Sequence, residues 1–524
     1  MGENTKSYDK EYDYIYDTIE SLKKRNSNML KSPNIIKIIN IVEKFIQENQ
    51  LICYGGMAIN NILPTNNQFY NKELEFPDYD FFSKNALSDA KKLADIYHKE
   101  GYNNIEAKSG IHEGTYKVYV NFLPVADITN IDSIFFNNII KKSIKKSNIL
   151  YAPPNFLRMS MYLELSRPLG DISRWEKVYE RLQLLNNAYP IINKNKTKPL
   201  KCNKLTIHNI NYNKYNNNTF KKIKDILIKS KCLFFGGYAL YFYSSYYKNN
   251  KNIKDIYNFD VFHENPLKCC QIINKSFDNK NHKLIYKQFN SIGKLIPTHY
   301  KVYVDNILYA TIYKPSACYS YNIHNINGKK IKIGTIFTLL SMYLTYIYID
   351  NKEYDQDKIL CIADLIYNIY LKNRLKNKGI LKNFTVNCYG SQEDLFDILL
   401  KKNKMYDKLK NKKKSEEYEQ YFLKYNPNVK LKGGNKNITL YYFYFDECPY
   451  CQSFNEIWEN IIKKEEFKNI NTKKIHKEDK LSSEFNIESY PSLILCKNNK
   501  EHINFKDIYG DKRTNKNILK FIQI

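Results

Sequence analysis

The stretch at 54–83, YGGMAINNILPTNNQFYNKELEFPDYDFFS, places two glycines before an apolar segment and then two aspartates one residue apart. Gly55 and Gly56 are typical of a turn that opens a helix, where backbone amides and the helix dipole favour a phosphate group. Asp78 and Asp80 fall on a predicted strand, whose alternate side chains share one face. An isolated pair of acids at a strand end is more often simply solvated, so this pair needs support from elsewhere in the chain.

The same pattern occurs again about 180 residues further along the chain, which indicates an internal duplication. CYGGMAINNI at 53–62 matches FFGGYALYFY at 234–243, and DYDFF at 78–82 matches NFDVF at 258–262. YKVYV and SMYL also recur, in the same order. Each copy reads as a glycine turn, a helix, a strand with acids, further strands and a long helix. The sequence therefore predicts two tandem modules of mixed α/β (α+β) fold.

The two copies differ at their acidic residues. Asp80 is matched by Asp260 in the second copy, whereas Asp78 is matched by Asn258. Asp127 is matched by Thr311. Three neighbouring carboxylates repel one another unless a cation neutralises them, and ligands that are all oxygen suit Mg²⁺ or Mn²⁺. The first copy is therefore predicted to hold a metal site for phosphoryl transfer, and the second copy to be degenerate.

Arginine is rare in this chain, yet four arginines fall close together in the first copy, at Arg158, Arg167, Arg174 and Arg181. A planar guanidinium suits contacts with phosphate or carboxylate groups. Arg158, next to the predicted metal site, is the best candidate for a nucleotide ligand. Pairing with nearby acids along a helix is the alternative, and we favour it for Arg174 and Arg181.

The chain is strongly basic, with 82 Lys and Arg against 54 Asp and Glu and a net charge of +28. Such a surplus attracts a polyanion. The longest uncharged apolar run, at 334–349, is too short and too rich in Ser and Thr for a membrane span, and no signal peptide is recognised. RNA or DNA is therefore favoured as a partner over a membrane. The irregular spacing of the 11 cysteines favours a reducing compartment.

The C-terminal part contains the sequence Cys-Pro-Tyr-Cys between a predicted strand and a predicted helix. Cys448 would lie at the helix N-terminus, where the helix dipole favours the attacking thiolate, with Cys451 as its partner. Tyr490-Pro491 precedes a later strand, and the whole resembles thioredoxin and disulfide-isomerase domains, in which a cis-proline faces the cysteines. Zinc binding is the alternative, but no second pair of Cys or His follows at ligand spacing.

The glycine pair, DYDFF and VADIT together resemble the nucleotidyltransferase superfamily of DNA polymerase β. GGMAIN, PDYDFFS, LRMSMYLELSRP and RWEKVYERL more closely resemble the poly(A) polymerase catalytic subunits of large cytoplasmic DNA viruses, of the poxvirus and giant-virus types. The resemblance covers about residues 35–400 and includes a degenerate second module. It implies a metal-binding catalytic triad at Asp78, Asp80 and Asp127 and a nucleotide-binding turn at Gly55 and Gly56.

The resemblance implies polyadenylation of RNA 3′ ends without a template. AMP would pass from ATP to an RNA 3′-hydroxyl with the help of two Mg²⁺ or Mn²⁺ ions, and pyrophosphate would leave. It also implies a homodimer and a location in the host cytoplasm or viral factory, with packaging in the virion as a further expectation. Transfer to tRNA or to a small molecule is the alternative, and so is a non-enzymatic RNA-binding scaffold. For the tail, Cys448, Cys451 and Pro491 imply a thiol-disulfide partner.

A chain of 524 residues has room for about three domains. An apolar stripe at helical spacing in the first residues predicts an amphipathic helix that packs on the first module; it consists of Tyr8, Tyr12, Ile15, Ile19 and Leu22. The predicted organisation is an N-terminal helical segment at 1–34, a catalytic nucleotidyltransferase module at 35–195, a degenerate nucleotidyltransferase-like module at 196–400, a basic helix and linker at 401–435, and a thioredoxin-like domain at 436–524.

Overall fold

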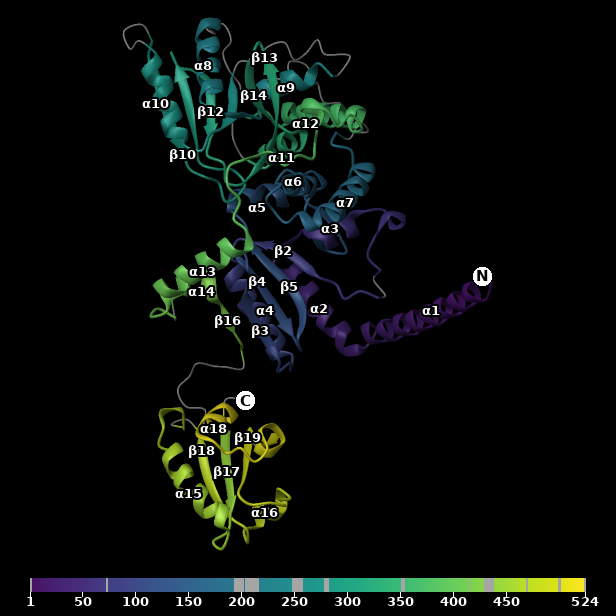
Figure 1. Cartoon of the computed structure of the whole chain (residues 1–524), viewed down its shortest axis with the longest axis vertical. Helices are drawn as coiled ribbons and strands as arrows, with labels where there is room; N and C mark the ends of the chain where they lie inside the picture. Colours follow the sequence, from purple (N-terminus) through teal and green to yellow (C-terminus); the bar gives the residue numbers. More distant parts are fainter. Residues whose placement is uncertain are drawn as a thin grey trace. The chain divides into compact units, whose positions relative to one another are not determined.

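The computed structural model divides the chain into two compact units, Met1–Asn428 and Val429–Ile524 (Figure 1). The larger unit contains two eight-stranded sheets, and the smaller unit contains a four-stranded sheet. Helices accompany the sheets in both units, so the chain has the mixed α/β fold that the sequence predicts. The residues that the structure describes are 2–71, 74–192, 202, 216–246, 258–277, 282–349, 354–413, 415–427, 438–467, 470–497 and 501–522.

The first sheet is built almost entirely from the first copy of the repeat. Across the sheet its strands are β16 (Lys424–Tyr425), β3 (Ile105–Ser109), β4 (Thr115–Val120), β5 (Leu123–Asn130), β2 (Tyr79–Ser83), β1 (Ile52–Cys53), β7 (Ile149–Tyr151) and β6 (Ile144–Lys146). β2 and β5 are parallel neighbours, and β3, β4 and β5 form an antiparallel meander. Side chains of β4 alternate between buried and half-buried, so one face of the sheet covers the core.

The second sheet repeats this order in the second copy. Its strands are β10 (Leu284–Phe289), β11 (His299–Val304), β12 (Ile307–Tyr313), β9 (Phe259–Phe262), β8 (Leu233–Phe234), β14 (Lys329–Gly334), β13 (Tyr319–Ile326) and β15 (Cys388–Tyr389). Even the bulge between Val118 and Tyr119 of β4 has its counterpart between Val302 and Tyr303 of β11. Seven successive strands therefore correspond in order and direction, as a duplication requires.

Two helices that carry the repeated SMYL sequence join the modules. α6 (Pro154–Leu165) packs against α11 (Ile336–Tyr346), and the ring centroids of Tyr162 and Phe337 lie 5.4 Å apart. Every residue of α11 is buried, which explains the apolar run of that helix. A second contact joins α7 (Trp175–Ala188) and α12 (Gln356–Asn373), where the hydroxyls of Tyr179 and Tyr370 lie 2.7 Å apart. The two modules therefore share one continuous core.

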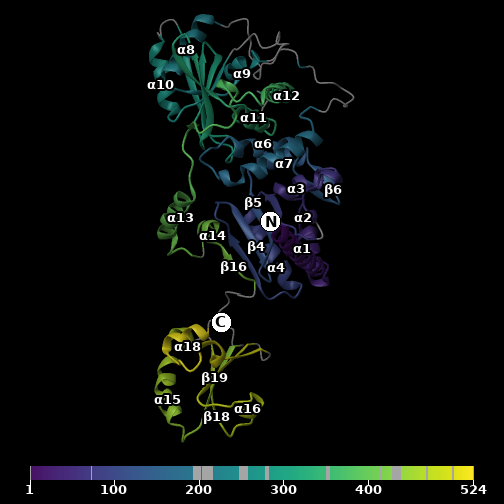
Figure 2. The same ribbon diagram turned by 45° about the vertical axis from the view of Figure 1, so that its right-hand side comes forward.

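The larger unit has further helices, most of which flank the two sheets (Figure 2). They are α1 (Gly2–Leu30), α2 (Pro33–Glu48), α3 (Gly55–Ile62), α4 (Ala86–Lys99), α5 (Ser133–Ile140), α8 (Asn217–Lys229), α9 (Gly237–Ser244), α10 (Pro266–Ser276), α13 (Leu395–Leu409) and α14 (Glu416–Phe422). None of the helices in the described part of the chain combines the length and the apolar character needed to cross a membrane.

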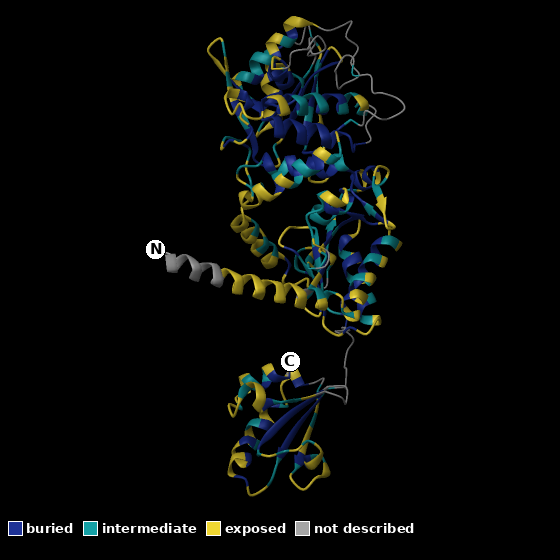
Figure 3. Cartoon of the chain, turned by 90° about the vertical axis from the view of Figure 1, so that its right-hand side faces the viewer, coloured by how far each residue is buried: buried dark blue, intermediate teal, exposed yellow. Residues whose placement is uncertain are grey.

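The N-terminal helix forms as predicted, but its predicted packing is wrong. Tyr12 is 58% exposed and Leu22 is 51% exposed, and Ile15 and Ile19 are exposed as well (Figure 3). Tyr8 lies outside the residues whose side chains the structure describes. Helical spacing of apolar residues predicts a helix, but tertiary structure decides whether its apolar stripe meets a partner.

The basic segment after the second module differs from the predicted helix and linker. Its first helix, α13, begins before the segment, and the chain then forms α14 and returns to the first module as β16. β16 pairs antiparallel with β3, and Lys91 Nζ lies 2.5 Å from Glu419 Oε2 of α14. A strand of two residues has too little periodicity to be recognised in a sequence.

The smaller unit has a four-stranded sheet and a hydrophobic core of its own. The strand order is β18 (Asn471–His476), β17 (Ile438–Tyr444), β19 (Ser492–Lys497) and β20 (Glu501–Asn504). Central β17 is parallel to β18 and antiparallel to β19. The helices are α15 (Pro449–Ile461), α16 (Lys480–Glu484), α17 (Phe505–Tyr509) and α18 (Asn515–Phe521). Leu440, Trp458 and Phe521 are among its buried side chains.

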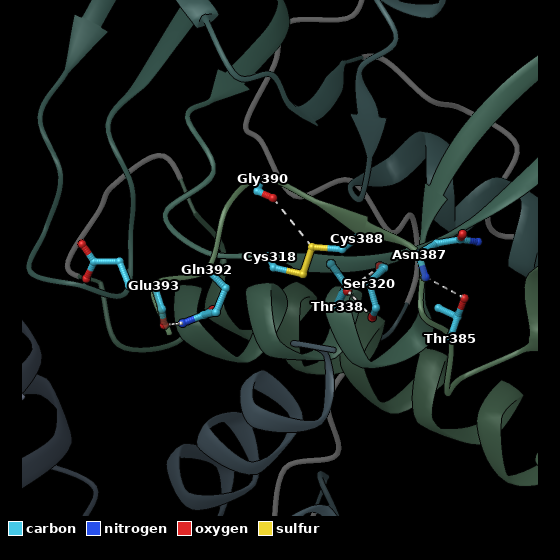
Figure 4. Close-up of a disulfide and its surroundings, with 9 residues drawn as sticks. All are labelled: Cys318, Ser320, Thr338, Thr385, Asn387, Cys388, Gly390, Gln392 and Glu393. Atoms are coloured by element: carbon cyan, nitrogen blue, oxygen red, sulfur yellow. Dashed lines mark hydrogen bonds between the residues drawn. A yellow bond between two sulfur atoms is a disulfide. The ribbon is translucent and has the colours of Figure 1, made fainter. Parts of the chain in front are cut away.

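Two disulfides, Cys202–Cys361 and Cys318–Cys388, depart from the expectation that the cysteines are reduced. β13 and β15 pair Tyr319 with Tyr389, which brings the preceding cysteines Cys318 and Cys388 together (Figure 4). The partners lie far apart in the sequence, so irregular spacing gave no sign of these pairs. The other seven cysteines are thiols.

Candidate active site

The three carboxylates of the predicted triad lie on neighbouring strands of the first sheet. Asp80 of β2 is directly opposite Asp127 of β5. Asp78 precedes β2 by one residue and shares the face of Asp80. On the other side of Asp127, Lys117 of β4 is its register partner and forms an ion pair with it. Parallel pairing of β2 with β5 therefore brings together acids that lie far apart in the sequence.

These carboxylates hold more negative charge than their protein neighbours neutralise. Burial, followed by the charges of Asp78 and Asp127, raises the pKa of Asp80 to about 7. Burial and the charge of Asp127 also raise the pKa of Asp78. Lys117 opposes both shifts but does not cancel them. A set of oxygen ligands with excess negative charge suits a hard divalent cation such as Mg²⁺ or Mn²⁺.

Cation binding should therefore depend on pH. The pKa of Asp80 is raised from 3.8 to about 7 in the folded chain. The free energy of unfolding therefore falls as pH rises between these two values, because the carboxyl ionises more readily in the unfolded chain. A divalent cation that binds the ionised triad offsets that loss. We expect saturating Mn²⁺ to stabilise the protein by about 2–3 kcal/mol at pH 8 and clearly less at pH 6. Thermal unfolding with and without Mn²⁺ measures this, with Asp80→Asn as the control; equal stabilisation at both pH values would contradict it.

The predicted glycine turn lies against the triad. α3 begins at Gly55, whose φ of +73° suits glycine, and the backbone amide of Tyr54 donates to the carbonyl oxygen of Asp80. A Cβ atom on Gly55 would lie 2.5 Å from Asp80 Oδ2. A Cβ atom on Gly56 would lie 2.6 Å from Arg181 Nη1. Both glycines therefore permit a close approach, Gly55 to the carboxylates and Gly56 to an arginine.

Arg158 and Arg181 occupy positions that the sequence did not indicate. Arg158 is 0% exposed and donates to the side chain of Asn155 and to the carbonyl oxygen of Tyr189, so it supports the core of the module. Arg181 Nη2 donates to Tyr70 Oη over 2.9 Å, and its guanidinium lies 4.7 Å from the ring centroid of Phe69.

Arg174 also lies near enough for its charge to lower the pKa of Asp80, although its Nε is 3.3 Å from Glu164 Oε1. Arg174 and Arg181 are separated by seven residues, a spacing that places them on one face of a helix. The predicted pairing with a nearby acid is confirmed for Arg174, which pairs with Glu164, and is wrong for Arg181, which contacts Tyr70 and Phe69. Arg181 was therefore missed as a neighbour of the glycine turn.

The equivalent position of the second module is closed. Asp260 is 5% exposed, and the amide of Asn258 lies 3.4 Å from its Oδ2. Thr311 takes the place of Asp127 and is buried, as is Lys301, its register partner. Gly236 still approaches closely, since its Cβ would lie 2.3 Å from Asp260 Oδ2. The second module thus keeps the backbone arrangement but lacks two carboxylates and access to solvent.

The predicted redox residues come together in the smaller unit. Cys448 is the N-cap of α15, and the backbone amide of Cys451 donates to Cys448 Sγ over 3.1 Å. Cys448 Sγ lies 3.8 Å from the carbonyl oxygen of Tyr490, and the peptide bond between Tyr490 and Pro491 is cis. Burial raises the pKa of Cys451 to about 11, so Cys451 favours the thiol form.

Three carboxylates on or next to adjacent strands, beside a helix-opening glycine turn, are the arrangement expected of a nucleotidyltransferase site. Residues 40–171 match the family model described as "Poly(A) polymerase catalytic subunit". Residues 414–524 match the family model described as "Thioredoxin". The two resemblances seen in the sequence are therefore confirmed, and the first matched segment includes the whole triad.

Similar viral proteins match mainly this first module. A "Putative poly(A) polymerase catalytic subunit" of Acanthamoeba polyphaga mimivirus is 33% identical over 158 residues, which cover 29% of this chain and 26% of that protein. A protein of the same description from African swine fever virus (strain Badajoz 1971 Vero-adapted) is 32% identical over 174 residues, which cover 32% of this chain and 36% of that protein. The match thus spans about a quarter to a third of these relatives' length.

The fold of the larger part of the chain also has a solved counterpart. The crystal structure of the Megavirus polyadenylate synthase superposes with a TM-score of 0.64 and 19% sequence identity. The superposition covers 80% of this chain and 86% of that one. The shared fold therefore extends well beyond the segment that the sequence matches cover.

Proposed function

We propose that this protein polyadenylates RNA, by transferring AMP from ATP to an RNA 3′-hydroxyl. The observation that carries the proposal is the complete triad of Asp78, Asp80 and Asp127 in the one module whose site is open, within the segment that matches the poly(A) polymerase family. Neighbouring carboxylates repel one another. A catalytic role explains why the first module keeps all three, whereas the closed module lacks two of them. A scaffold that only bound RNA would not need them.

Each residue of the site would have a defined role in this reaction. The triad would hold two divalent ions, which supply charge neutralisation at the α-phosphate and activate the 3′-hydroxyl for attack. Gly55 and Gly56 present the N-terminus of α3 to the triphosphate. Arg181, rather than Arg158, is placed beside that turn and is our candidate for a phosphate contact. The 3′-hydroxyl loses its proton to water as its oxygen bonds to the α-phosphorus, the bond from that phosphorus to the bridging oxygen breaks, and pyrophosphate leaves.

The acceptor that the charges favour is a nucleic acid. A cavity of about 400 Å³ lies between the modules and is lined by Arg167 of the first and by Lys294 and Lys314 of the second. Together with the net charge of +28, it offers a path for a phosphate backbone. A small-molecule acceptor would not require such a surplus, so RNA is the acceptor we propose.

RNA affinity should fall steeply with salt and depend little on base sequence. If about six phosphates are contacted, affinity falls by roughly two to three orders of magnitude between about 50 and 200 mM salt, because counterions are released on binding. Replacing Lys294 and Lys314 with glutamine should lower the magnitude of the logarithmic slope by about 1.4. The matched control replaces Lys463 and Lys464 of the smaller unit. Filter binding across a salt series measures the slopes, and a shallow wild-type slope would contradict this picture.

The direct test of the function uses the purified chain, an oligoribonucleotide, Mg²⁺ or Mn²⁺, and each nucleoside triphosphate in turn. Extension of the RNA with ATP, and much less with the other three, supports polyadenylation. Addition of a fixed short sequence to tRNA, or transfer to a small hydroxyl compound, would indicate another nucleotidyltransferase. Binding of RNA without extension would leave the scaffold alternative.

The tail unit should be dispensable for this chemistry, because nucleotidyl transfer needs no thiol. We expect deletion of residues 429–524 to leave the extension rate within about twofold of wild type, as for a separate domain with its own core. The isolated tail should fold and form a reversible disulfide between Cys448 and Cys451. Mass spectrometry across a glutathione series measures this; thiols that stay reduced throughout would remove the proposed redox role and its thiol-disulfide partner.

The homodimer, the viral-factory location and packaging in the virion, which the resemblance implies, stay predictions. Light scattering at micromolar protein concentration measures the oligomeric state.

A further inference from the structure

The second module contains a cluster of potential ligands for a transition metal that plays no part in the proposed reaction. Cys232, His263 and Cys269 each offer one ligand atom, and these three atoms lie within 4.8 Å of one another. Cys232 directly precedes β8, His263 directly follows β9, and Cys269 belongs to α10. The two cysteines are 1% and 0% exposed, whereas His263 is half-buried. Three separate elements therefore bring thiol and imidazole groups to one point.

The spacing of the two sulfurs agrees with a shared metal ion. Cys232 Sγ and Cys269 Sγ lie 3.9 Å apart. Two thiolates at the zinc–sulfur distance of about 2.3 Å, in tetrahedral geometry, place their sulfurs about 3.8 Å apart, whereas a disulfide bond is about 2.0 Å long. The thiols therefore need little movement to bind zinc together and a much larger one to form a disulfide.

The surroundings of His263 suit a ligand. Its Nδ1 accepts from the backbone amide of Asn265 over 3.0 Å in one tautomer and donates to the carbonyl oxygen of Asn265 over 2.8 Å in the other. In the tautomer whose Nδ1–H donates to the carbonyl oxygen, Nε2 carries the lone pair. A hydrogen bond from the far nitrogen to a backbone carbonyl is the usual support of a metal-bound histidine. The half-buried side of His263 leaves access for water as a fourth ligand.

The first module shows that the fold does not require these three residues. Its equivalent positions hold Leu51, Ser83 and Asp89, and there Ser83 Oγ donates to Asp89 Oδ2 over 2.6 Å. The local backbone is the same in both copies. The amide of Asn85 donates to Ser83 Oγ, and the amide of Asn265 donates to His263 Nδ1 in the same way. The second copy thus carries three ligands suited to a soft metal where the first copy carries a leucine and a hydrogen-bonded pair.

We propose that Cys232, His263 and Cys269 bind one zinc ion, which ties β8, β9 and α10 of the second module together. Two thiolates balance the charge of Zn²⁺, and the ligand set is too soft for the Mg²⁺ or Mn²⁺ of the carboxylate triad. The two metal sites of the chain are therefore distinguished by ligand chemistry, hard oxygens in the first module and sulfur with nitrogen in the second.

The test measures bound metal in the full chain carrying Cys448→Ser and Cys451→Ser, so that the tail thiols do not contribute. After exhaustive dialysis and addition of Zn²⁺, mass spectrometry of the elements should find about one tightly bound zinc per chain. Co²⁺ should replace it and give the visible absorption bands and thiolate charge-transfer bands of tetrahedral coordination. No bound zinc, or octahedral cobalt spectra without charge transfer, would overturn the proposal.

Variants locate the metal. Cys232→Ser and Cys269→Ser should each lose it, whereas Cys270→Ser, which alters the neighbouring buried thiol, should keep it. A triple variant, Cys232→Leu with His263→Ser and Cys269→Asp, restores the residues of the first module and should fold without zinc. Zinc retained by the triple variant, or lost equally in Cys270→Ser, would refute the site. A disulfide between Cys232 and Cys269 in the untreated protein would refute it as well.

Discussion

Asp80→Asn is expected to lower the rate of RNA extension by at least about a thousandfold, which corresponds to about 4 kcal/mol of transition-state stabilisation. Asp80 faces Asp127 directly and shares its face with Asp78, so its charge lies at the centre of the proposed metal site. Asp78→Asn and Asp127→Asn should also abolish extension. Single-turnover extension of a labelled oligoribonucleotide measures the effect.

Two controls distinguish lost chemistry from lost fold. Asp260→Asn makes the same change at the equivalent, closed position and should leave extension nearly normal. Asp80→Asn should also raise the metal-free stability at pH 8, because it removes a carboxylate whose pKa the fold raises to about 7. Equal damage from Asp260→Asn and Asp80→Asn would show that the assignment of active and degenerate modules is wrong.

Gly55→Ala is expected to lower the extension rate by about a hundredfold and the free energy of unfolding by about 1–2 kcal/mol. The stability cost arises because φ at this position is +73°, where a side chain is strained. The larger loss of rate arises because the new Cβ atom would lie 2.5 Å from Asp80 Oδ2 and must displace that carboxylate. Kinetics and denaturant unfolding of the same variant measure the two effects.

The chain offers a separate control for each cause. Gly101 has φ +94° and open space around its Cβ position, so Gly101→Ala tests backbone strain without contact with a carboxylate. A Cβ atom on Gly236 would lie 2.3 Å from Asp260 Oδ2, so Gly236→Ala tests the same contact in the closed module. Both should reduce stability and leave extension within about threefold of wild type. A comparable loss of rate in either control would contradict a role for Gly55 beside the triad.

Prediction from sequence succeeded where a pattern was repeated or locally complete. The duplication of glycines, acids and YKVYV could be read directly, and the structure shows the same strand order in both copies. The position of Asp127 opposite Asp80 follows because both lie on buried strands of one unit. In the tail, Cys448 and Cys451 lie at a predicted helix start. Each of these features depends on local periodicity or on a repeated motif, both of which the sequence records.

Prediction failed where the outcome depends on which surfaces meet. Arg158 and Arg181 are both helical arginines. Arg158 is buried, whereas the packing of α7 places Arg181 beside the glycine turn, and the sequence does not show this difference. The exposed stripe of α1 and the pairing of Cys318 with Cys388 depend in the same way on contacts between distant segments. Where no repeat or motif links two distant segments, a single sequence shows no sign that they touch.

Because the chain returns to the first module as β16, a fragment that contains only the two modules must include β16. A truncation at residue 400, the end of the repeat, would remove β16 and the buried side chain of Leu423 and leave the hydrogen-bonding edge of β3 bare. Bare edges of sheets recruit strands from other molecules, so such a fragment would precipitate or form oligomers through β3. A fragment that ends after Pro427 keeps the edge covered and is the shorter form suited to concentration and crystallisation.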